Sequence, residues 1–357
     1  MRRLIKALVA WARYSSEKVS VAMADSDSDD AVRELADADA CYGTLTPMLL
    51  AAAPRLRWCQ CPMAAPPESY FFKELAESAV VVTNMRGIYD QELSVHIMTL
   101  MLAVNRQLGD YRDQQKQHKY SQLTFNRGEF RDAANLSPAD ERVDISTATA
   151  LLVGVGNAGI ETARLCKAFG MTTLGCDARR TEPHPYIDEL YGADALHELL
   201  PRADFVLVTV PHTPDTEGMF DESKFALMKS TSVFVNVGRG ATTQLRDLDR
   251  ALRQGTIGGA AIDVFEVEPL PEDHPICEPS ATLWRLARSG PYFTNMCCAM
   301  PCIAPGDAPN FLMTPHVAIQ GNPDKTTMGH VQVVVDNVGL MLDNKPLRNV
   351  VDKITRF

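Results

Sequence analysis

The chain has no uninterrupted apolar run near the roughly 20 residues that a membrane-spanning helix requires. It is also short of positive charge, because 35 lysines and arginines face 45 aspartates and glutamates and leave a formal net charge of -10. An acidic surface repels phosphate backbones and anionic membranes. We therefore expect neither nucleic acid nor a membrane among the partners of this protein. The sequence also contains no internal repeat of the solenoid type.

Cysteine is neither dense nor regularly spaced in this chain. The nine cysteines are odd in number and scattered, unlike those of a disulfide-stabilised secreted domain. Reduced thiols and a cytoplasmic location are therefore expected. A mitochondrial location stays open, because the N-terminus holds no acidic side chain but several basic ones, Arg2, Arg3, Lys6 and Arg13. Leu4, Leu8 and Trp11 recur at helical spacing, so an amphipathic helix is the other interpretation of this segment.

Short apolar segments alternate with helical patterns along most of the chain. The first part predicts strands at 19–23, 40–43, 56–61 and 79–84. A long helix is predicted over 92–115, because its apolar residues recur every three or four positions. Residues 126–147 are polar and rich in charge, as the passage into a second domain would be. We predict a substrate domain over 1–120, completed by 321–357, and a second domain over 121–320.

The second part follows the doubly wound α/β pattern, in which parallel strands alternate with crossover helices. Strands are predicted at 149–155, 171–177, 204–210, 232–237 and 259–263. Helices are predicted between them, one with Asp221 as its N-cap and one closed by Gly255. A last helix over 325–342 is expected to pack back across the first domain.

A glycine-rich turn follows the first strand of the second domain. Gly154, Gly156 and Gly159 stand at the spacing of the dinucleotide-binding fingerprint and lead directly into a helix. In that context the first glycine allows a tight turn, the second lets the backbone approach a pyrophosphate, and the third lets helix and strand pack closely. The helix N-terminus adds free N–H groups and the positive end of a dipole.

The end of the next strand carries the acidic residue that completes this fingerprint. Asp177 lies about 20 residues beyond the glycines, where a carboxylate accepts hydrogen bonds from the ribose hydroxyls and repels a 2′-phosphate. NAD is therefore the expected cofactor. Arg179 and Arg180 follow at once and offer charge for a 2′-phosphate, so NADP stays open.

Three further polar residues, Arg239, Glu268 and His316, are predicted to lie beyond strand ends. Ligands in open α/β sheets bind beyond the carboxyl ends of the strands, so we expect these side chains to meet there. An arginine fork grips a carboxylate and polarises a carbonyl, and a histidine protonates the oxygen as hydride reaches carbon. A carboxylate on the other ring nitrogen fixes the tautomer of the histidine. These are the groups that the reduction of a 2-oxo acid needs.

The sequence around these positions carries a family likeness. The stretches concerned are LLVGVGNAGIETARLCKAFGM, DFVLVTVPHTPDTEGMF, MKSTSVFVNVGRG, ALRQGTIGGAAIDVFEVEPLPEDHPI and NFLMTPHVA. In them the chain resembles the D-isomer-specific 2-hydroxyacid dehydrogenases. The resemblance implies two doubly wound domains, a Rossmann NAD(P)-binding domain and a flavodoxin-like substrate domain, with the active site in the cleft between them. It implies Arg239 as the substrate-binding arginine, Glu268 as the acid paired with histidine, and His316 as the proton donor.

The resemblance also assigns cofactor contacts and an activity. The contacts fall on Asn157, Ala158, Asp177, Val237, Gly238 and Asp263, with His212 in a loop beside the cofactor. Members of the family are commonly homodimers paired through the cofactor domain, so a homodimer is implied. The implied activity is the reduction of a small 2-oxo acid, such as glyoxylate or hydroxypyruvate, to the D-2-hydroxy acid. A dinucleotide-sensing binding protein of the co-repressor type, without catalysis, is the alternative.

The predicted substrate loop departs from the family pattern. Where the family has a small Gly-Ala-Gly type turn, this chain reads Pro62-Met63-Ala64-Ala65-Pro66-Pro67, and its prolines have no N–H to donate. Ala64 and Ala65 remain candidates for substrate contact in this turn. Arg86 or Tyr89 stands where the family approaches the cleft, and we expect one of them to supply part of the missing grip on the carboxylate. An ordinary ion pair is the other interpretation of Arg86.

A segment over about 277–306 separates the Glu268 motif from the His316 motif. An unpatterned segment of this length is uncommon in a compact domain, and we interpret it as an inserted surface loop or as a segment wrongly included by a gene model. A zinc site is the alternative, with His274 joining Cys277, Cys297, Cys298 and Cys302. The spacing of these residues fits no common zinc pattern, so no metal is expected. On the long helix, His96 is interpreted as structural.

Overall fold

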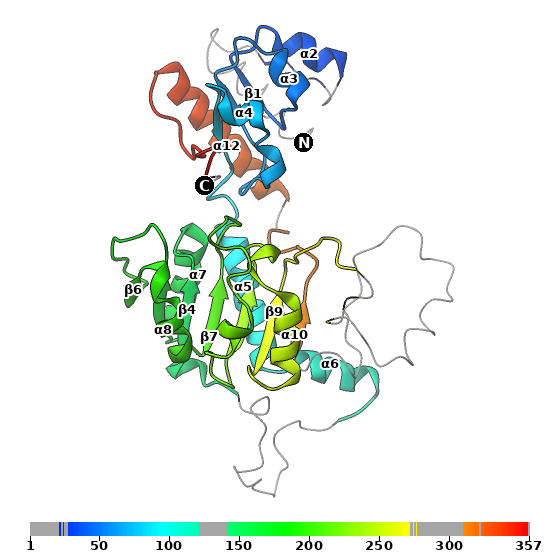
Figure 1. Ribbon diagram of the computed structural model, residues 1–357, viewed down its shortest axis with the longest axis vertical. Coiled ribbons are helices and arrows are strands. Elements are labelled where there is room, and N and C mark those ends of the chain that lie inside the picture. The colour runs from blue at the N-terminus through cyan, green and yellow to red at the C-terminus, as the bar shows by residue number, and fades with distance from the viewer. Residues whose placement is uncertain are drawn as a thin grey trace, which may run out of the picture. The chain divides into compact units, whose positions relative to one another are not determined.

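The computed structural model describes residues 21–22, 24, 28–120, 142–271, 274, 276, 310–320 and 323–355. The predicted N-terminal helix, most of the strand at 19–23 and the segment 277–306 lie outside these residues. The chain forms two compact units, residues 1–89 with 320–357 and residues 90–319 (Figure 1). Within the described part of the chain, no helix is long and apolar enough to cross a membrane.

The first unit is built on a small parallel sheet. Its strands β1 (Ala40–Tyr42), β2 (Trp58–Gln60) and β3 (Val81–Thr83) lie side by side in that order. They confirm the strands predicted at 40–43, 56–61 and 79–84. The helices that precede or connect them are α2 (Asp29–Leu35), α3 (Pro47–Ala51) and α4 (Lys73–Glu77). Fully buried side chains such as Cys59, Leu75 and Val82 form the core between sheet and helices.

The C-terminal helix α12 (Pro323–Leu342) also belongs to the first unit, as predicted. Its residues Val331 and Val334 pack against Trp58 and Met85. The buried Asn337 donates hydrogen bonds to Gln60 Oε1 at 3.1 Å and to the carbonyl of Arg348 at 3.2 Å. A buried amide is costly unless its hydrogen bonds are satisfied, so these contacts fix the register of α12 on the sheet.

The second unit is a seven-stranded sheet in the order β10-β9-β8-β7-β4-β5-β6, and every pairing is parallel. The predicted strands are confirmed as β4 (Thr149–Val153), β5 (Thr172–Cys176), β7 (Phe205–Val208), β8 (Val233–Asn236) and β9 (Gly259–Ile262). Two half-buried edge strands were not predicted, β6 (Glu189–Tyr191) and β10 (Phe311–Met313). The connecting helices are α7 (Asn157–Ala168), α8 (Leu196–Leu199), α9 (Glu222–Phe225) and α10 (Leu245–Arg253). The sheet is thus a Rossmann-like layer (Figure 1).

The predicted helix over 92–115 is two helices instead of one. Helix α5 (Asp90–Asn105) ends before Gln107, whose φ of 52° interrupts the helical path, and α6 (Leu108–Lys116) follows. The apolar stripe of α5 packs against α7 and the second sheet, so α5 belongs to the second unit. The division between the units therefore lies at 89/90, whereas the sequence analysis drew its boundary near 120.

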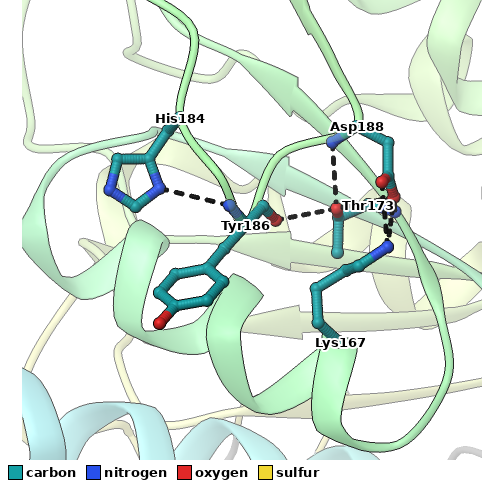
Figure 2. Close-up of polar contacts among 5 residues, drawn as sticks. All are labelled: Lys167, Thr173, His184, Tyr186 and Asp188. Carbon is teal, nitrogen blue, oxygen red and sulfur yellow. Dashed lines mark hydrogen bonds and ion pairs between the residues drawn. The ribbon is translucent and has the colours of Figure 1, made fainter.

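The connection from β5 to β6 is held by a carboxylate (Figure 2). Asp188 accepts hydrogen bonds from Lys167 Nζ at 2.8 Å and from the backbone N–H of Thr173 at 2.8 Å. The Thr173 hydroxyl donates to the carbonyl of Tyr186, whose N–H donates to His184 Nδ1 at 3.4 Å. Burial raises the pKa of Asp188, but the bonds from Lys167 and Thr173 outweigh it and leave that pKa below its usual value.

Candidate active site

The candidate residues of the second unit all follow the carboxyl ends of parallel strands. Gly154 follows β4, Asp177 follows β5, Arg239 lies just beyond β8, Asp263 follows β9, and His316 lies just beyond β10. Since these strands run in one direction, their carboxyl ends meet at one edge of the sheet. That edge is where open α/β sheets bind ligands.

The glycine loop has the geometry that a dinucleotide needs. Gly154 has a φ of 97°, and an added Cβ would lie 2.9 Å from Thr209 Oγ1. A Cβ on Gly159 would lie 2.1 Å from the carbonyl oxygen of Gly154. A Cβ on Gly156 would meet no atom within 4 Å, so open space lies at the first turn of α7, which has no side-chain cap. This cradle fits a pyrophosphate held by the helix N-terminus.

Asp177 is fixed beside that loop by backbone donors. Its Oδ1 accepts from the N–H groups of Arg179 at 2.8 Å and Arg180 at 2.9 Å, and its Oδ2 accepts from Val155 N–H at 2.6 Å. Burial raises the pKa of Asp177, and these three bonds more than offset it, so the pKa lies below its usual value. The ionised carboxylate has lone pairs left for ribose hydroxyls. The Arg180 side chain is tied to the carbonyl of Val155 at 2.8 Å.

Glu268 and His316 come together although they are separated by 48 positions in the sequence. Glu268 Oε2 lies 2.7 Å from His316 Nδ1, and Glu268 Oε1 accepts from the N–H of Phe265 at 2.9 Å. Each carboxylate oxygen thus has its own partner, which fixes the plane of the imidazole and the tautomer with hydrogen on Nδ1. The His316 side chain is 45% exposed, so the ring is open to a ligand.

The loop that carries His316 is clamped by the buried carboxylate of Asp263. Asp263 Oδ1 accepts from Thr314 Oγ1 at 2.5 Å and from Val317 N–H at 2.9 Å, and Oδ2 accepts from Ala318 N–H at 2.9 Å. His316 itself has a φ of 52°, and its N–H donates to the Asp263 carbonyl at 2.8 Å. A bulky residue rarely holds a positive φ unless its surroundings impose it. Asp263 therefore sets the position of His316, a role that the sequence analysis did not foresee.

His96 supports the same clamp from helix α5. Its Nε2 lies 3.1 Å from Thr314 Oγ1 and 3.5 Å from Asp263 Oδ1. Since the Thr314 hydroxyl donates to Asp263, its oxygen accepts from His96. Burial raises the pKa of Asp263, but the bonds from His96, Thr314 and the two backbone N–H groups lower it below its usual value. His96 was interpreted as structural, and its contacts in this unit are of that kind.

Arg239 lies on a turn that Asn236 organises. The Asn236 side chain accepts from Gly238 N–H at 2.9 Å and donates to Thr243 Oγ1 at 2.9 Å. Arg239 Nη1 donates to the Gly238 carbonyl at 2.6 Å. Burial lowers the pKa of Arg239, and the negative charge of Glu268 opposes that effect. A guanidinium keeps its charge in proteins, so a partly desolvated cation lies in the field of Glu268.

The remaining cofactor candidates lie around the same edge. Asn157 and Ala158 form the first turn of α7, and Val237 is buried. A Cβ on Gly238 would lie 2.6 Å from the Val210 carbonyl oxygen, so the turns after β7 and β8 approach closely. His212, on the turn after β7, has its Nε2 3.8 Å from Glu217 Oε2. Their contacts with a cofactor stay predictions.

The candidate substrate residues belong to the first unit, and they too follow the carboxyl ends of parallel strands. Ala64 and Ala65 lie in the turn after β2, while Arg86 and Tyr89 follow β3. The N–H of Met85 donates to the Met63 carbonyl at 3.0 Å and ties the two turns together. The Arg86 side chain is exposed and Tyr89 is half-buried.

No metal-binding cluster of histidine, cysteine or carboxylate side chains exists among the residues that the structure describes. His274 Nδ1 accepts from the N–H of Ile276 at 3.3 Å. The cysteines of the zinc alternative lie outside the described residues. Cysteines 41, 59, 61, 166 and 176, which are described, carry free thiols.

Comparison with known sequences finds a matching family model and relatives that are named as glyoxylate reductases. Residues 98–284 match the family model "D-isomer specific 2-hydroxyacid dehydrogenase, NAD binding domain". A glyoxylate reductase of Korarchaeum cryptofilum is 30% identical over 69% of this chain and 71% of its own length. A glyoxylate reductase of Aeropyrum pernix is 31% identical over 67% of this chain and 70% of its own length.

Solved structures share the architecture over nearly the whole chain. A D-isomer specific 2-hydroxyacid dehydrogenase family protein from Aeromonas salmonicida superposes with a TM-score of 0.73 at 26% identity, covering 99% of this chain and 97% of the other. An NADPH-dependent glyoxylate/hydroxypyruvate reductase from Sinorhizobium meliloti, solved with NADP and sulfate, has a TM-score of 0.69 at 23% identity. It covers 100% of this chain and 97% of its own and supports the fold alone.

Proposed function

We propose that this chain reduces a small 2-oxo acid of the glyoxylate or hydroxypyruvate type to the D-2-hydroxy acid. The chain belongs to the D-isomer-specific 2-hydroxyacid dehydrogenase family and is therefore an NAD(P)-dependent oxidoreductase. The observation that carries the proposal is the contact of 2.7 Å between Glu268 and His316, at the sheet edge that also bears Arg239. Names of the relatives support the substrate class.

Arg239 is proposed to bind the substrate. Its planar fork matches a carboxylate, and its charge also polarises the neighbouring carbonyl. Partial burial strengthens both effects, because a charge acts more strongly where water is excluded. Arg86 or Tyr89, with N–H groups of Ala64 and Ala65, is proposed to supply part of the grip on the substrate carboxylate, because Pro66 and Pro67 have no N–H to donate.

His316 is proposed to protonate the carbonyl oxygen. With Nδ1 bound to Glu268, the proton that is transferred resides on Nε2, and Glu268 stabilises the charged ring from which it leaves. The clamp at Asp263 holds the backbone of this loop in place, so the ring keeps its orientation without reorganising during the reaction.

The cofactor is proposed to lie along the carboxyl edge of the second sheet, where reduced nicotinamide would supply the hydride. Gly156 and the first turn of α7, with Asn157 and Ala158, would hold the pyrophosphate. Asp177 would accept from the ribose hydroxyls, which favours NAD over NADP. His212, Val237, Gly238 and Asp263 are proposed to line the nicotinamide half.

The test is loss of absorbance at the reduced-nicotinamide band, with NADH or NADPH and a panel of 2-oxo acids led by glyoxylate and hydroxypyruvate. We expect turnover that falls about 10²–10⁴-fold in His316→Ala, the size of a general-acid contribution. The variant should still bind the cofactor. His197→Ala removes an exposed histidine and is the matched control. Cofactor binding without turnover of any acid would instead favour the dinucleotide-sensing protein.

A further inference from the structure

Two cysteines lie opposite each other on neighbouring strands of the first unit. Cys41 is the central residue of β1 and pairs in register with Cys59, the central residue of β2. Residues that pair in register on parallel strands present their side chains on the same face of the sheet. Both side chains pack in one hydrophobic cluster, and both thiols are free. The proposed chemistry of Arg239, Glu268 and His316 gives this pair no task.

The separation of the two strands suits a disulfide. Neighbouring strands of a sheet lie about 4.8 Å apart, and the Cα atoms of a disulfide lie about 4.4–6.8 Å apart. The sulfurs of Cys41 and Cys59 can therefore bond without a movement of the strands. Cys61 follows β2 on the same face, but the register places Gly43 opposite it, and its Sγ accepts from the N–H of Met63 at 3.4 Å.

The two paired thiols differ in access and in acidity. Cys41 is half-buried and therefore reached by solvent, whereas Cys59 is fully buried. Hydrogen bonding with Cys41 lowers the pKa of Cys59 against the effect of burial, and the same interaction raises the pKa of Cys41. When the pair loses one proton, the negative charge is therefore favoured on Cys59. A thiolate is the form of cysteine that attacks another sulfur.

Three other cysteines of the described residues lack this combination. Burial raises the pKa of Cys166 to about 12 and the pKa of Cys176 and of Cys61 to about 11. Buried thiols of this kind are inert. We therefore expect them to stay reduced under conditions in which Cys41 and Cys59 react.

We infer that Cys41 and Cys59 are an oxidation site, at which a hydroperoxide converts the two thiols into a reversible disulfide. The inference does not depend on the proposed function. The site is complete within the first unit, because both strands and the hydrophobic cluster around the thiols belong to it.

The reaction has two steps. In the first, the exposed Cys41 sulfur attacks one oxygen of the peroxide, the O–O bond breaks, and Cys41 becomes a sulfenic acid. The proton of Cys41 passes through Cys59 to the departing hydroxide, which leaves as water. In the second, the Cys59 thiolate attacks the Cys41 sulfur, so that the S–S bond forms and the S–O bond breaks. The second oxygen leaves as hydroxide and is protonated by solvent. The two sulfurs lose two electrons, and the peroxide gains them.

The position of Cys59 protects Cys41 from irreversible damage. A sulfenic acid that meets no thiol is oxidised further to sulfinic acid, which thiol reductants do not reverse. Cys59 lies opposite Cys41 in the register, so the second step competes well with a second molecule of peroxide. The resulting disulfide returns to two thiols with a dithiol reductant.

The test treats the reduced full chain with hydrogen peroxide, blocks the remaining thiols under denaturing conditions and maps tryptic peptides by mass spectrometry. Trypsin places Cys41 in the peptide 34–55 and places Cys59 with Cys61 in the peptide 58–73. We expect these two peptides to be cross-linked, with fragmentation locating the bond at Cys59. The cross-link should disappear after treatment with dithiothreitol.

Two serine variants identify the partner of Cys41. Cys59→Ser should abolish the cross-link and leave Cys41 with two added oxygens, as sulfinic acid. Cys61→Ser is the matched control, because it removes a thiol from the same peptide and should keep the cross-link. Thermal unfolding of both variants checks that they fold. If Cys59→Ser fails to fold, the wild-type fragmentation and Cys61→Ser still decide which cysteine is bonded.

Three results would overturn the inference. The first is a wild-type protein that forms no cross-link between the two peptides in excess peroxide. The second is a cross-link that fragmentation places at Cys61 or that Cys61→Ser abolishes. The third is oxidation of Cys166 and Cys176 at the same rate as the pair, which would show that the register of Cys41 and Cys59 confers no reactivity.

Discussion

At the scale of residues, Asp177 is proposed to set the preference for NAD over NADP. Its carboxylate is held by three backbone N–H groups, and its pKa lies below the usual value, so its negative charge is fixed beside the glycine loop, where we propose that the ribose binds. Arg179 and Arg180 supply the opposing charge. The side chain of Arg180 is tied to Val155, which limits its reach.

We predict that wild-type protein has a higher kcat/KM with NADH than with NADPH, and that Asp177→Asn moves the ratio toward NADPH on the order of 10-fold. Removal of the carboxylate charge abolishes its repulsion of a phosphate close by. Initial rates with both cofactors at a fixed 2-oxo acid measure the ratio. Asp188→Asn, at the other end of the β5–β6 connection, is the control for a general disturbance of this segment. A ratio that favours NADPH in the wild type would contradict the assignment.

At the scale of elements, the clamp between β9 and the loop after β10 depends on an ionised carboxylate. The pKa of Asp263 is lower when folded than when unfolded. Its contribution to stability is therefore fully present above the unfolded pKa of about 3.9 and is lost as pH falls through the folded value.

Asp263→Asn should lower the free energy of unfolding by about 3 kcal/mol near pH 7, because it leaves buried N–H donors with a weaker acceptor. That difference from wild type should stay constant down to about pH 5 and narrow below about pH 4. Urea unfolding at several pH values measures it. A difference that grew as the pH fell would show that the carboxylate is protonated in the folded state.

Regular elements were the most predictable part of the fold. Short, mostly apolar segments that alternate with helical patterns predict β4, β5, β7, β8 and β9, because the strands of a parallel sheet are buried on both faces. The break after α5 was not predictable, since glutamine at position 107 gives no signal for a positive φ. Contacts such as His96 with Thr314 are set by tertiary packing, which no local pattern encodes.

The residues of the candidate site could be predicted from the sequence, but the contacts between their side chains could not. The spacing of Glu268 and His316 says nothing of a contact at 2.7 Å, which depends on the pairing of β10 with β9. Thr314 and Asn236 were missed as positioning residues. A signal was present for Asn236, which ends the predicted strand β8 directly before Val237. Thr314 lies two residues before His316, after a strand that was not predicted.

At the scale of the whole molecule, we predict a homodimer. The side chains of Val95 on α5 and Leu108 on α6 are 57% and 54% exposed, and both lie in the second unit. Light scattering should give twice the chain mass of 39.3 kDa. Leu108→Glu should shift the population toward monomer, because a buried unpaired charge is costly at an interface, whereas Leu342→Glu on α12 should not. A wild-type monomer at micromolar concentration would refute the homodimer.

The double attachment of the His316 loop has a consequence for the length of the chain between Glu268 and β10. Its backbone is bound to Asp263, and the strand before it pairs with β9 at Phe311 and Ala260, while Glu268 accepts from the N–H of Phe265 just after β9. The positions of Glu268 and of β10 are therefore each fixed by contacts with β9 or the chain just after it. The entropic cost of closing a flexible connection rises by only about 0.6 kcal/mol for each doubling of its length. A longer connection between these anchors should therefore cost little stability and leave the pair formed by His316 and Glu268 in place.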